Sequence, residues 1–295
     1  MSVSPSRLLV TGASGQLGRR VIELLLEAET PNLIAASRDP AKLADLAVRG
    51  VETRRADFDD PASLAVAFAG VDRLLLVSTD ALNQPGRRIA QHRAAVAAAA
   101  AAGVKHVVYT SAPGARPQVD GGVIDDHFWT EQALAASAIP GWTILRHNLY
   151  AELLLMGAGQ AVASGALYSA TAGAGRAYVS REDCARIDAA ALRQGEGRKI
   201  LDVSGPAAVT QDEVAALYSQ LSGKPVTHHA LSPDALRQGL LAASLPPSLV
   251  AVLVDFDVAA AEGQHAIVTD AVEALTGQPP VSVAAFLEAH RAAFS

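Results

Sequence analysis

The chain has 295 residues, of which half are hydrophobic and only 4% aromatic, so alanine and leucine supply most of any core. This length suits one large α/β unit, or a nucleotide-binding domain with a smaller lobe. The formal charge of −6 and the lack of a lysine- or arginine-rich run argue against a nucleic-acid partner.

A single cysteine, Cys184, rules out an internal disulfide and suits a reducing compartment. Residues 1–8 contain no apolar core of a signal peptide, and the alanine-rich run 94–102 is too short to cross a bilayer. We therefore expect a soluble cytoplasmic protein without a membrane partner.

The first predicted unit is a strand, a glycine turn and a helix. Residues 8–10 form an apolar run typical of a buried central strand, and residues 16–28 carry apolar side chains at helical spacing. Gly12 and Gly15 lie in the turn between this strand and helix, and Gly18 lies in the first turn of the helix. The three glycines have the spacing G-x-x-G-x-x-G. These glycines would allow a tight turn, the approach of a pyrophosphate and close helix packing, in that order. The open amides of the helix N-terminus also attract an anion. We therefore expect a dinucleotide to bind Gly12, Ala13, Ser14, Gly15, Gln16 and Leu17.

The second predicted strand, residues 32–37, ends where NAD-preferring sites place an Asp or Glu for the ribose 2′-hydroxyl. This chain has Ser37-Arg38 there, and a guanidinium can pair with a phosphate in bidentate fashion. We therefore expect Arg38 to select NADPH; the alternative is a solvated loop charge. Asp39-Pro40 then begins a helix, and Lys42, one turn in, is either a second ligand of that phosphate or a solvated charge.

The third predicted strand, residues 51–56, ends at Asp57-Phe58. In a dinucleotide-binding fold the loop after this strand passes the adenine. Asp57 can accept a hydrogen bond from the adenine amino group, and Phe58 can pack on the ring. Equally, Asp57 is a turn residue and Phe58 a core residue.

The fourth and fifth strands, residues 72–77 and 105–110, are followed by Ser78-Thr79 and Ser111. Because ligands bind outside the carboxyl ends of such strands, we expect these hydroxyls near the pyrophosphate or ribose. The helix between them, residues 89–102, is nearly all alanine. This favours close packing, either against a twin subunit in a homodimer or simply because alanine has a high helix propensity.

Residues 112–124 form a loop by composition and suit a lid or substrate rim. A helix over residues 125–137 follows, in which His127 is more often a helix-face histidine than a catalytic one. The sixth strand, residues 141–146, leads into a polar segment where the nicotinamide end of a cofactor would lie. We expect the cofactor contacts of that segment to come from His147, Asn148, Tyr150 and Glu152.

Beyond residue 152 strands and helices no longer alternate regularly, which predicts a smaller lobe. A capping box, Thr210 to Glu213, precedes one of its helices, and His228 and His229 are neighbours on a strand and so point to opposite faces. No metal site is therefore expected. The helices are predicted over residues 153–163, 183–194, 214–221, 232–243, 247–260 and 283–293, and the strands over 178–180, 199–203 and 226–230.

The predicted fold class is α/β, a Rossmann doubly wound parallel sheet with a smaller C-terminal α/β lobe. Residues 1–152 form the NADP-binding Rossmann domain, with the sheet completed from residues 176–204. Residues 153–295 form a mainly substrate-binding lobe.

Four segments carry a family resemblance: Thr11–Gly18, Ser37–Lys42, Leu74–Ser78 and Gly103–Ser111. With them the chain resembles the NmrA-like atypical short-chain dehydrogenases, and within that group it is most similar to type-2 NAD(P)H:quinone oxidoreductases and triphenylmethane dye reductases. The order of motifs holds through residues 277–280. The resemblance implies NADPH held by the glycine loop, Arg38 and the loops after the fourth and sixth strands, with the substrate between the sheet and the C-terminal lobe.

Two departures from the quinone reductases concern the substrate side. Their helix reads Thr-Glu-Lys where this chain has Thr130-Glu131-Gln132. Their loop after the sixth strand ends in an asparagine that is proposed to meet the quinone, and this chain has Leu153 there. The resemblance therefore carries over the cofactor more firmly than the identity of the acceptor.

The chain lacks the Tyr-x-x-x-Lys pair with which orthodox short-chain dehydrogenases protonate an alkoxide. The residues four positions after the five tyrosines are Pro113, Leu154, Ala172, Glu182 and Ser222. This disfavours a nucleotide-sugar epimerase and an isolated ketone as substrate. It favours hydride transfer from NADPH to a quinone or other conjugated acceptor, with Tyr150 and His147 as the catalytic candidates that orient it.

A second hypothesis is an NmrA-type redox sensor, which binds the dinucleotide and regulates a protein partner without turnover. The two hypotheses differ in whether a quinone is turned over.

Overall fold

The computed structural model describes residues 5–82, 84–119 and 121–294. The chain divides into two compact units, one comprising Met1–Arg146 with Cys184–Leu201 and the other His147–Asp183 with Asp202–Ser295. Residues 1–4 belong to the segment 1–8 that was considered as a signal peptide, and Asp120 belongs to the predicted loop 112–124. These residues lie outside the described part of the chain.

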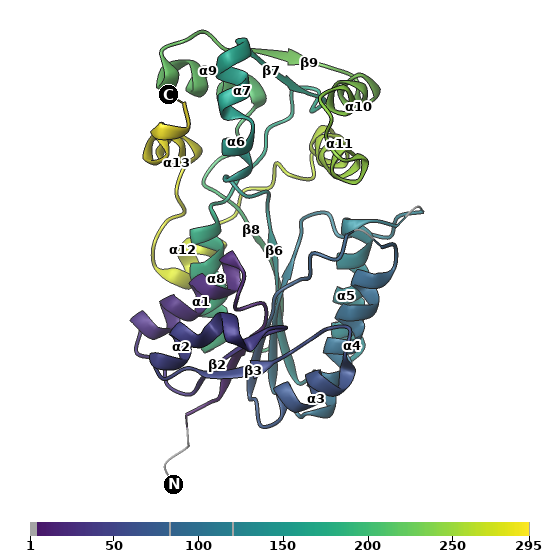
Figure 1. Ribbon diagram of the computed structural model, residues 1–295, viewed down its shortest axis with the longest axis vertical. Helices are drawn as coiled ribbons and strands as arrows, with labels where there is room; N and C mark the ends of the chain where they lie inside the picture. Colours follow the sequence, from purple (N-terminus) through teal and green to yellow (C-terminus); the bar gives the residue numbers. More distant parts are fainter. Residues whose placement is uncertain (1–4, 83, 120, 295) are drawn as a thin grey trace. The chain divides into compact units, whose positions relative to one another are not determined.

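The first unit is organised around a seven-stranded sheet with the order β3-β2-β1-β4-β5-β6-β8 (Figure 1). All five printed pairings of its strands are parallel, and the register sets Leu9 of β1 opposite Ile34 of β2 and Leu74 of β4. The strands are β1 (Leu8–Val10), β2 (Leu33–Ser37), β3 (Glu52–Arg55), β4 (Arg73–Leu76), β5 (His106–Ser111), β6 (Gly141–His147) and β8 (Arg198–Val203). The predicted Rossmann fold class is confirmed.

Helices cover both faces of this sheet. One face carries α1 (Gln16–Glu27), α2 (Ala44–Val48) and α8 (Arg181–Gln194), and the other α3 (Pro61–Phe68), α4 (Arg87–Ala101) and α5 (Val123–Ala136) (Figure 1). A short 3-10 helix, η1 (Pro40–Leu43), precedes α2 and is capped by Asp39, whose carboxylate accepts from the Ala41 amide at 3.1 Å.

The alanine-rich helix α4 packs inside its own unit, between α3 and α5. Its residues Ala95, Val96 and Ala99 are buried in one core with alternate strand residues such as Leu74 and Val107. Side chains alternate between the faces of a strand, so residues two apart enter the same core. Close helix packing within the chain therefore already uses the small alanine side chains.

Two glycines of the first unit occupy positions that a side chain would disturb. Gly12 has φ of +62°, a left-handed conformation that L-residues rarely adopt. At Gly18 an added Cβ would lie 2.6 Å from the carbonyl oxygen of Gly12. The tight turn and the close packing of α1 that the glycine spacing predicts are therefore present.

The second unit has a two-stranded parallel sheet of β7 (Ala166–Ser169) and β9 (Thr227–Ala230). Its main core includes Tyr218, Phe286 and Leu287. The predicted capping box is confirmed, since Thr210 and Glu213 bond reciprocally at the start of α9 (Gln211–Ser222). Its other helices are α6 (Leu153–Met156), α7 (Ala158–Ser164), α9 (Gln211–Ser222), α10 (Pro233–Ala242), α11 (Pro247–Ala261), α12 (Ala271–Thr276), α13 (Val283–Ala289) and the 3-10 helix η2 (Arg291–Phe294).

The structure differs from the sequence-based prediction at four places in this unit. Residues 178–180 form only an isolated parallel β-bridge, between Val179 and Tyr150, and no strand. The neighbouring Ala177 amide donates to a different segment, at the His265 carbonyl. The strand β7 and the short helix α12 were not predicted, and the helix expected over 153–163 is two helices that meet at Gly157.

In the described part of the chain, no helix combines the length and apolar character that crossing a membrane would need. Nor do those residues contain a group of three His, Cys, Asp or Glu side chains placed to hold a metal ion. His228 contacts the Ser169 hydroxyl at 2.8 Å and the Asp212 carboxylate at 3.0 Å, while His229 stacks on Tyr168.

Candidate functional site

A pocket of about 460 Å³ lies in the first unit. Its walls come from the glycine turn after β1 and from the loops after β2, β3 and β4, so it lies at the carboxyl ends of neighbouring parallel strands. This is where open α/β sheets bind ligands. The predicted residues that line it are Gly12, Ser14, Gly15, Arg38, Asp57, Phe58, Ser78 and Thr79. Other lining residues are Ser37, Ala56, Val77, Asp80, Ala81, Arg87 and Gln91.

The glycine turn offers backbone rather than side chains to this pocket. Gly15 is the N-cap residue of α1, and no side chain caps the amides of the first helical turn. The Gly15 amide itself donates to the Gly12 carbonyl at 2.9 Å, which closes the turn. Uncapped amides with the positive end of a helix dipole behind them suit a phosphate group.

The end of β2 carries a cation and two hydroxyls. Arg38 is exposed and lines the pocket, and no described residue forms a hydrogen bond or ion pair with its guanidinium. The hydroxyls of Ser14 and Ser37 lie 2.9 Å apart, and the Asp39 amide donates to Ser37 Oγ at 3.3 Å. This edge of the pocket therefore offers donors for an anion and no carboxylate in the position where NAD-preferring sites have one.

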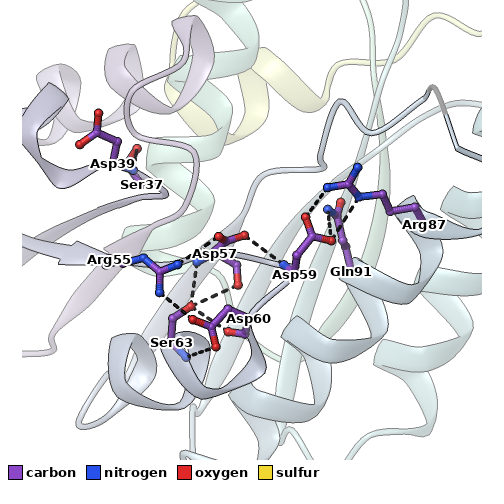
Figure 2. A network of polar contacts seen from close by, with 9 residues as sticks. All are labelled: Ser37, Asp39, Arg55, Asp57, Asp59, Asp60, Ser63, Arg87 and Gln91. Atoms are coloured by element: carbon purple, nitrogen blue, oxygen red, sulfur yellow. Dashed lines mark hydrogen bonds and ion pairs between the residues drawn. The ribbon is translucent and has the colours of Figure 1, made fainter.

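The loop after β3 is held by its own polar contacts (Figure 2). The Asp57 amide donates to Ser63 Oγ at 2.9 Å, and the Asp57 carboxylate accepts from the Asp59 amide at 3.1 Å. Arg55 donates to Asp57 at 3.2 Å and to Asp60 at 2.6 Å. The adenine contact predicted for Asp57 would therefore be made by a carboxylate that already has partners.

The sequence left open whether Phe58 is a core residue or a residue of the adenine pocket, and the structure places it in the core and in the pocket wall. It is 9% exposed and belongs to the core with Leu9 and Leu64, yet it also lines the pocket.

Asp59, Arg87 and Gln91 form a second cluster of this loop with the start of α4 (Figure 2). Arg87 donates to both carboxylate oxygens of Asp59, at 3.2 Å and 2.6 Å, and Gln91 Nε2 donates to one of them at 2.9 Å. These hydrogen bonds, that from Arg87 first, hold the pKa of Asp59 below its usual value. The Asp59 carboxylate is therefore charged near neutral pH and holds Arg87 at the pocket wall.

The loop after β4 is fastened to α4 through Thr79. Its amide donates to His92 Nε2 at 3.0 Å, its hydroxyl to Gln91 Oε1 at 2.8 Å, and its carbonyl accepts from Arg88 Nε at 2.8 Å. The three partners lie three and four positions apart and so share one face of the helix. All polar groups of Thr79 are therefore engaged, which fixes this wall of the pocket.

The contact with Thr79 also determines the protonation of His92. An amide donates to Nε2, so that nitrogen is unprotonated, and Nδ1 carries the proton toward Thr130 Oγ1 at 2.9 Å. Burial, followed by the charge of Arg88, lowers the pKa of His92 well below its usual value. The histidine thus stays neutral and the anchor of the loop does not titrate near neutral pH.

His127, for which catalysis was one interpretation, is buried and contacts Arg88 at 3.0 Å and Tyr109 at 2.8 Å. Because Arg88 also donates to the Thr79 carbonyl, His127 belongs to the same network of buried polar side chains.

Five predicted cofactor ligands of the first unit are not among the residues that line the pocket: Ala13, Gln16, Leu17, Lys42 and Ser111. The Ser111 hydroxyl donates to the buried Glu131 carboxylate at 2.7 Å, and Arg146 binds the same carboxylate at 2.9 Å and 2.7 Å. Their roles toward a cofactor stay predictions.

The remaining predicted residues belong to the second unit. Asn148 is buried, and its side chain donates to the His265 carbonyl at 3.0 Å and accepts from the Leu149 amide at 2.8 Å. Glu152 accepts from the Arg181 amide at 3.0 Å. These contacts order the segment that follows β6.

Tyr150 and His147 lie near each other in this segment, with ring centroids 6.4 Å apart. The Arg181 guanidinium lies over the Tyr150 ring at 5.1 Å, a cation–π contact that holds the ring in place. Tyr109, Tyr178 and Tyr218 are buried, and burial raises the pKa of Tyr109 and Tyr218. Tyr150 is half-buried, and Tyr168 is exposed.

Sequence reasoning missed Arg87 and Gln91 as pocket residues. A signal was present for Gln91 but not for Arg87, since Arg88, Gln91 and His92 are polar residues at helical spacing in an alanine-rich helix. All three are buried, which polar side chains rarely are unless they have partners.

Known proteins that are similar to this chain bind NAD(P)H, as their family description and names state. The model of the NAD(P)H-binding family matches residues 12–195. Quinone oxidoreductase 2 of Escherichia coli is 36% identical over 279 residues, which cover 94% of this chain and 96% of that protein. The crystal structure of that oxidoreductase with NADPH superposes with a TM-score of 0.89, at 35% identity, over 96% of this chain and 99% of the other.

Two further relatives are named an azoreductase and a triphenylmethane reductase. NAD(P)H azoreductase of Xenophilus azovorans is 32% identical and covers 97% of this chain and 99% of its own. Triphenylmethane reductase of Citrobacter sp., solved with NADP(H), has a TM-score of 0.88 at 31% identity and covers 96% of this chain and 99% of the other. The predicted resemblance to quinone and dye reductases is confirmed.

Proposed function

Since the chain belongs to the NAD(P)H-binding family, we propose that it is an NADPH-dependent oxidoreductase that passes hydride directly to a quinone or another conjugated, electron-poor acceptor. The observation that carries the cofactor part is Arg38, an exposed guanidinium on the rim of the pocket that the glycine turn lines, with no hydrogen bond or ion pair to any described residue.

The residues of the first unit suit a dinucleotide. The amides that open α1 hold the pyrophosphate, and Arg38 pairs with the 2′-phosphate. Asp57 and Phe58 border the adenine, and Ser78 and Thr79 the ribose or pyrophosphate. When bound, NADPH supplies the hydride that the reaction transfers.

The protein's own work in the reaction is positioning. A quinone or cationic dye spreads or cancels the charge that hydride brings, so no strong acid is needed at the moment of transfer. Tyr150 and His147 orient the acceptor, and the segment that holds them also meets the nicotinamide end of the cofactor, with contacts from Asn148 and Glu152. Residues 153–295 serve mainly to bind the acceptor.

The kinship with quinone and dye reductases supports this acceptor class. Gln132 and Leu153 stand where the quinone reductases have lysine and asparagine, so we propose an acceptor that does not depend on those two side chains.

A steady-state assay with NADPH and benzoquinone tests the proposal. We expect turnover that saturates in both reactants. Tight binding of NADPH without turnover on a panel of quinones, azo dyes and triphenylmethane dyes would overturn the enzymatic proposal and favour a dinucleotide-binding redox sensor.

A further inference from the structure

Two serine hydroxyls meet at the edge of the dinucleotide pocket. Ser14 belongs to the glycine turn and Ser37 is the last residue of β2, and their Oγ atoms lie 2.9 Å apart. Both residues line the pocket, beside Arg38. Ser37 is only 5% exposed, whereas Ser14 is exposed.

Counting protons shows what this pair can do. Two hydroxyls carry two protons, and their mutual hydrogen bond uses one of them. Ser37 Oγ also accepts from the Asp39 amide at 3.3 Å (Figure 2 shows Ser37 beside Asp39). No described residue accepts a hydrogen bond from either hydroxyl outside the pair. One O–H donor is therefore left over at the pocket edge.

The exposed member of the pair is the one placed to deliver that proton. Either hydroxyl can be the donor of the 2.9 Å contact. Because only Ser14 is exposed, the arrangement that serves a ligand has Ser37 donating to Ser14 Oγ and Ser14 directing its own O–H into the pocket. A chain of hydrogen bonds in one direction also polarises its last donor, which strengthens a bond to an anion.

Resting on the proposed NADPH site, we propose that Ser14, oriented by Ser37, is a donor to the cofactor's 2′-phosphate beside Arg38. Ser37 is a positioning residue of this subsite and contributes to the preference for NADPH over NADH. Its neutral side chain also matters, since a carboxylate at the end of β2 would bind a ribose 2′-hydroxyl and repel the phosphate.

The test compares two fragments that differ only in the 2′-phosphate, adenosine 2′,5′-bisphosphate and adenosine 5′-monophosphate, by calorimetric titration of the full chain. Ser37→Thr and Ser37→Val form a matched pair, because they have nearly the same shape and only threonine keeps the hydroxyl. Ser14→Ala, at an exposed position, tests the donor itself.

For Ser14→Ala we expect about a tenfold or greater loss of affinity for the bisphosphate, as for a hydrogen bond to a charged group, with the monophosphate unchanged. Ser37→Val should lose several-fold on the bisphosphate alone, and Ser37→Thr should recover that loss. NADPH and NADH, titrated in parallel, should follow the same pattern.

Equal weakening of both fragments in Ser14→Ala would mean that the pair only ties the glycine turn to β2, and would overturn the inference. So would identical affinities of the Thr and Val variants. Failure of the proposed function has a different signature, in which the wild-type protein already binds NADPH and NADH equally or turns over no acceptor.

Discussion

At the scale of single residues, cofactor preference rests on Arg38. Its guanidinium lines the pocket and forms no hydrogen bond or ion pair with a described residue. Arg38→Ala should therefore weaken NADPH by about 1.5–3 kcal/mol, the range for hydrogen bonds to charged groups, and leave NADH nearly unchanged. Titration of both cofactors measures this, with Arg49→Ala, an exposed arginine that does not line the pocket, as the control. Equal loss for both cofactors would show that Arg38 does not bind the 2′-phosphate.

Tyr150 and His147 make a different prediction, because they orient an acceptor rather than protonate it. Tyr150→Phe and His147→Ala should each lower quinone turnover by tens-fold at most, and raise KM as much as they lower kcat. General acid catalysis would be worth about 10²–10⁴-fold, so the size of the loss separates the two roles. Complete loss of turnover in Tyr150→Phe would reveal an obligatory proton donor.

His265 predicts how acid affects stability. It is 2% exposed, and burial, followed by the charge of Arg176, lowers its pKa to about 4 from the usual 6.5. Between these values the unfolded chain binds a proton that the folded chain does not. The free energy of unfolding should therefore be full above pH 6.5 and fall as the pH drops toward 4.

Denaturant unfolding of wild type and His265→Asn at several pH values checks this, and the variant should show a shallower decline. His106 of the first unit, whose pKa burial also lowers to about 4, keeps its own contribution in both proteins. An unchanged slope in the variant would mean that His265 is not linked to unfolding.

The sequence predicts residues of the pocket only where a local pattern requires them. The glycine triplet and Arg38 follow directly from the turn after β1 and the end of β2. Arg87 and Gln91 could not be predicted in the same way, because their place in the pocket depends on Asp59 and Thr79, which come from two other loops.

At the scale of elements, the packing of α1 on β1 separates two roles of glycine. A Cβ at Gly15 would lie 3.3 Å from the Gly12 carbonyl oxygen, a tight contact that a small shift relieves, whereas at Gly18 it would lie 2.6 Å from that oxygen. Gly15→Val should keep the fold and abolish dinucleotide binding, because the side chain fills the space of the pyrophosphate. Gly18→Val should destabilise the protein by about 1–3 kcal/mol or more through overpacking.

Circular dichroism, thermal unfolding and NADPH titration of both variants test this contrast. Unaltered cofactor affinity in a folded Gly15→Val protein would contradict the assignment of the glycine turn. A Gly18→Val protein as stable as wild type would contradict the packing argument.

The elements of the first unit could be predicted because each buried strand and each capped helix has its own local signal, such as Asp39-Pro40 before η1. In the second unit the backbone of residues 177–179 bonds to segments far along the chain, at His265 and Leu149. A local pattern does not encode which segment the backbone will pair with, and the predicted strand over 178–180 is reduced to an isolated bridge between Val179 and Tyr150.

At the scale of the whole molecule, the chain consists of two compact units, and the basis for a functional role differs between them. The first follows a topology in which ligands bind at the carboxyl ends of parallel strands, and its pocket lies there. The second contains Tyr150 and His147, and its role toward the acceptor is inferred from kinship with quinone and dye reductases.

The most direct test of the central claim compares benzoquinone with cyclohexanone as acceptors for NADPH in steady state. We expect brisk turnover of the quinone, because the charge that hydride brings is delocalised over its conjugated ring. We expect little turnover of the ketone, because its basic alkoxide needs a proton donor. Orthodox short-chain dehydrogenases supply that proton from a Tyr-x-x-x-Lys pair, which this chain lacks. Brisk reduction of cyclohexanone, or no reduction of benzoquinone with NADPH bound, would contradict the central claim.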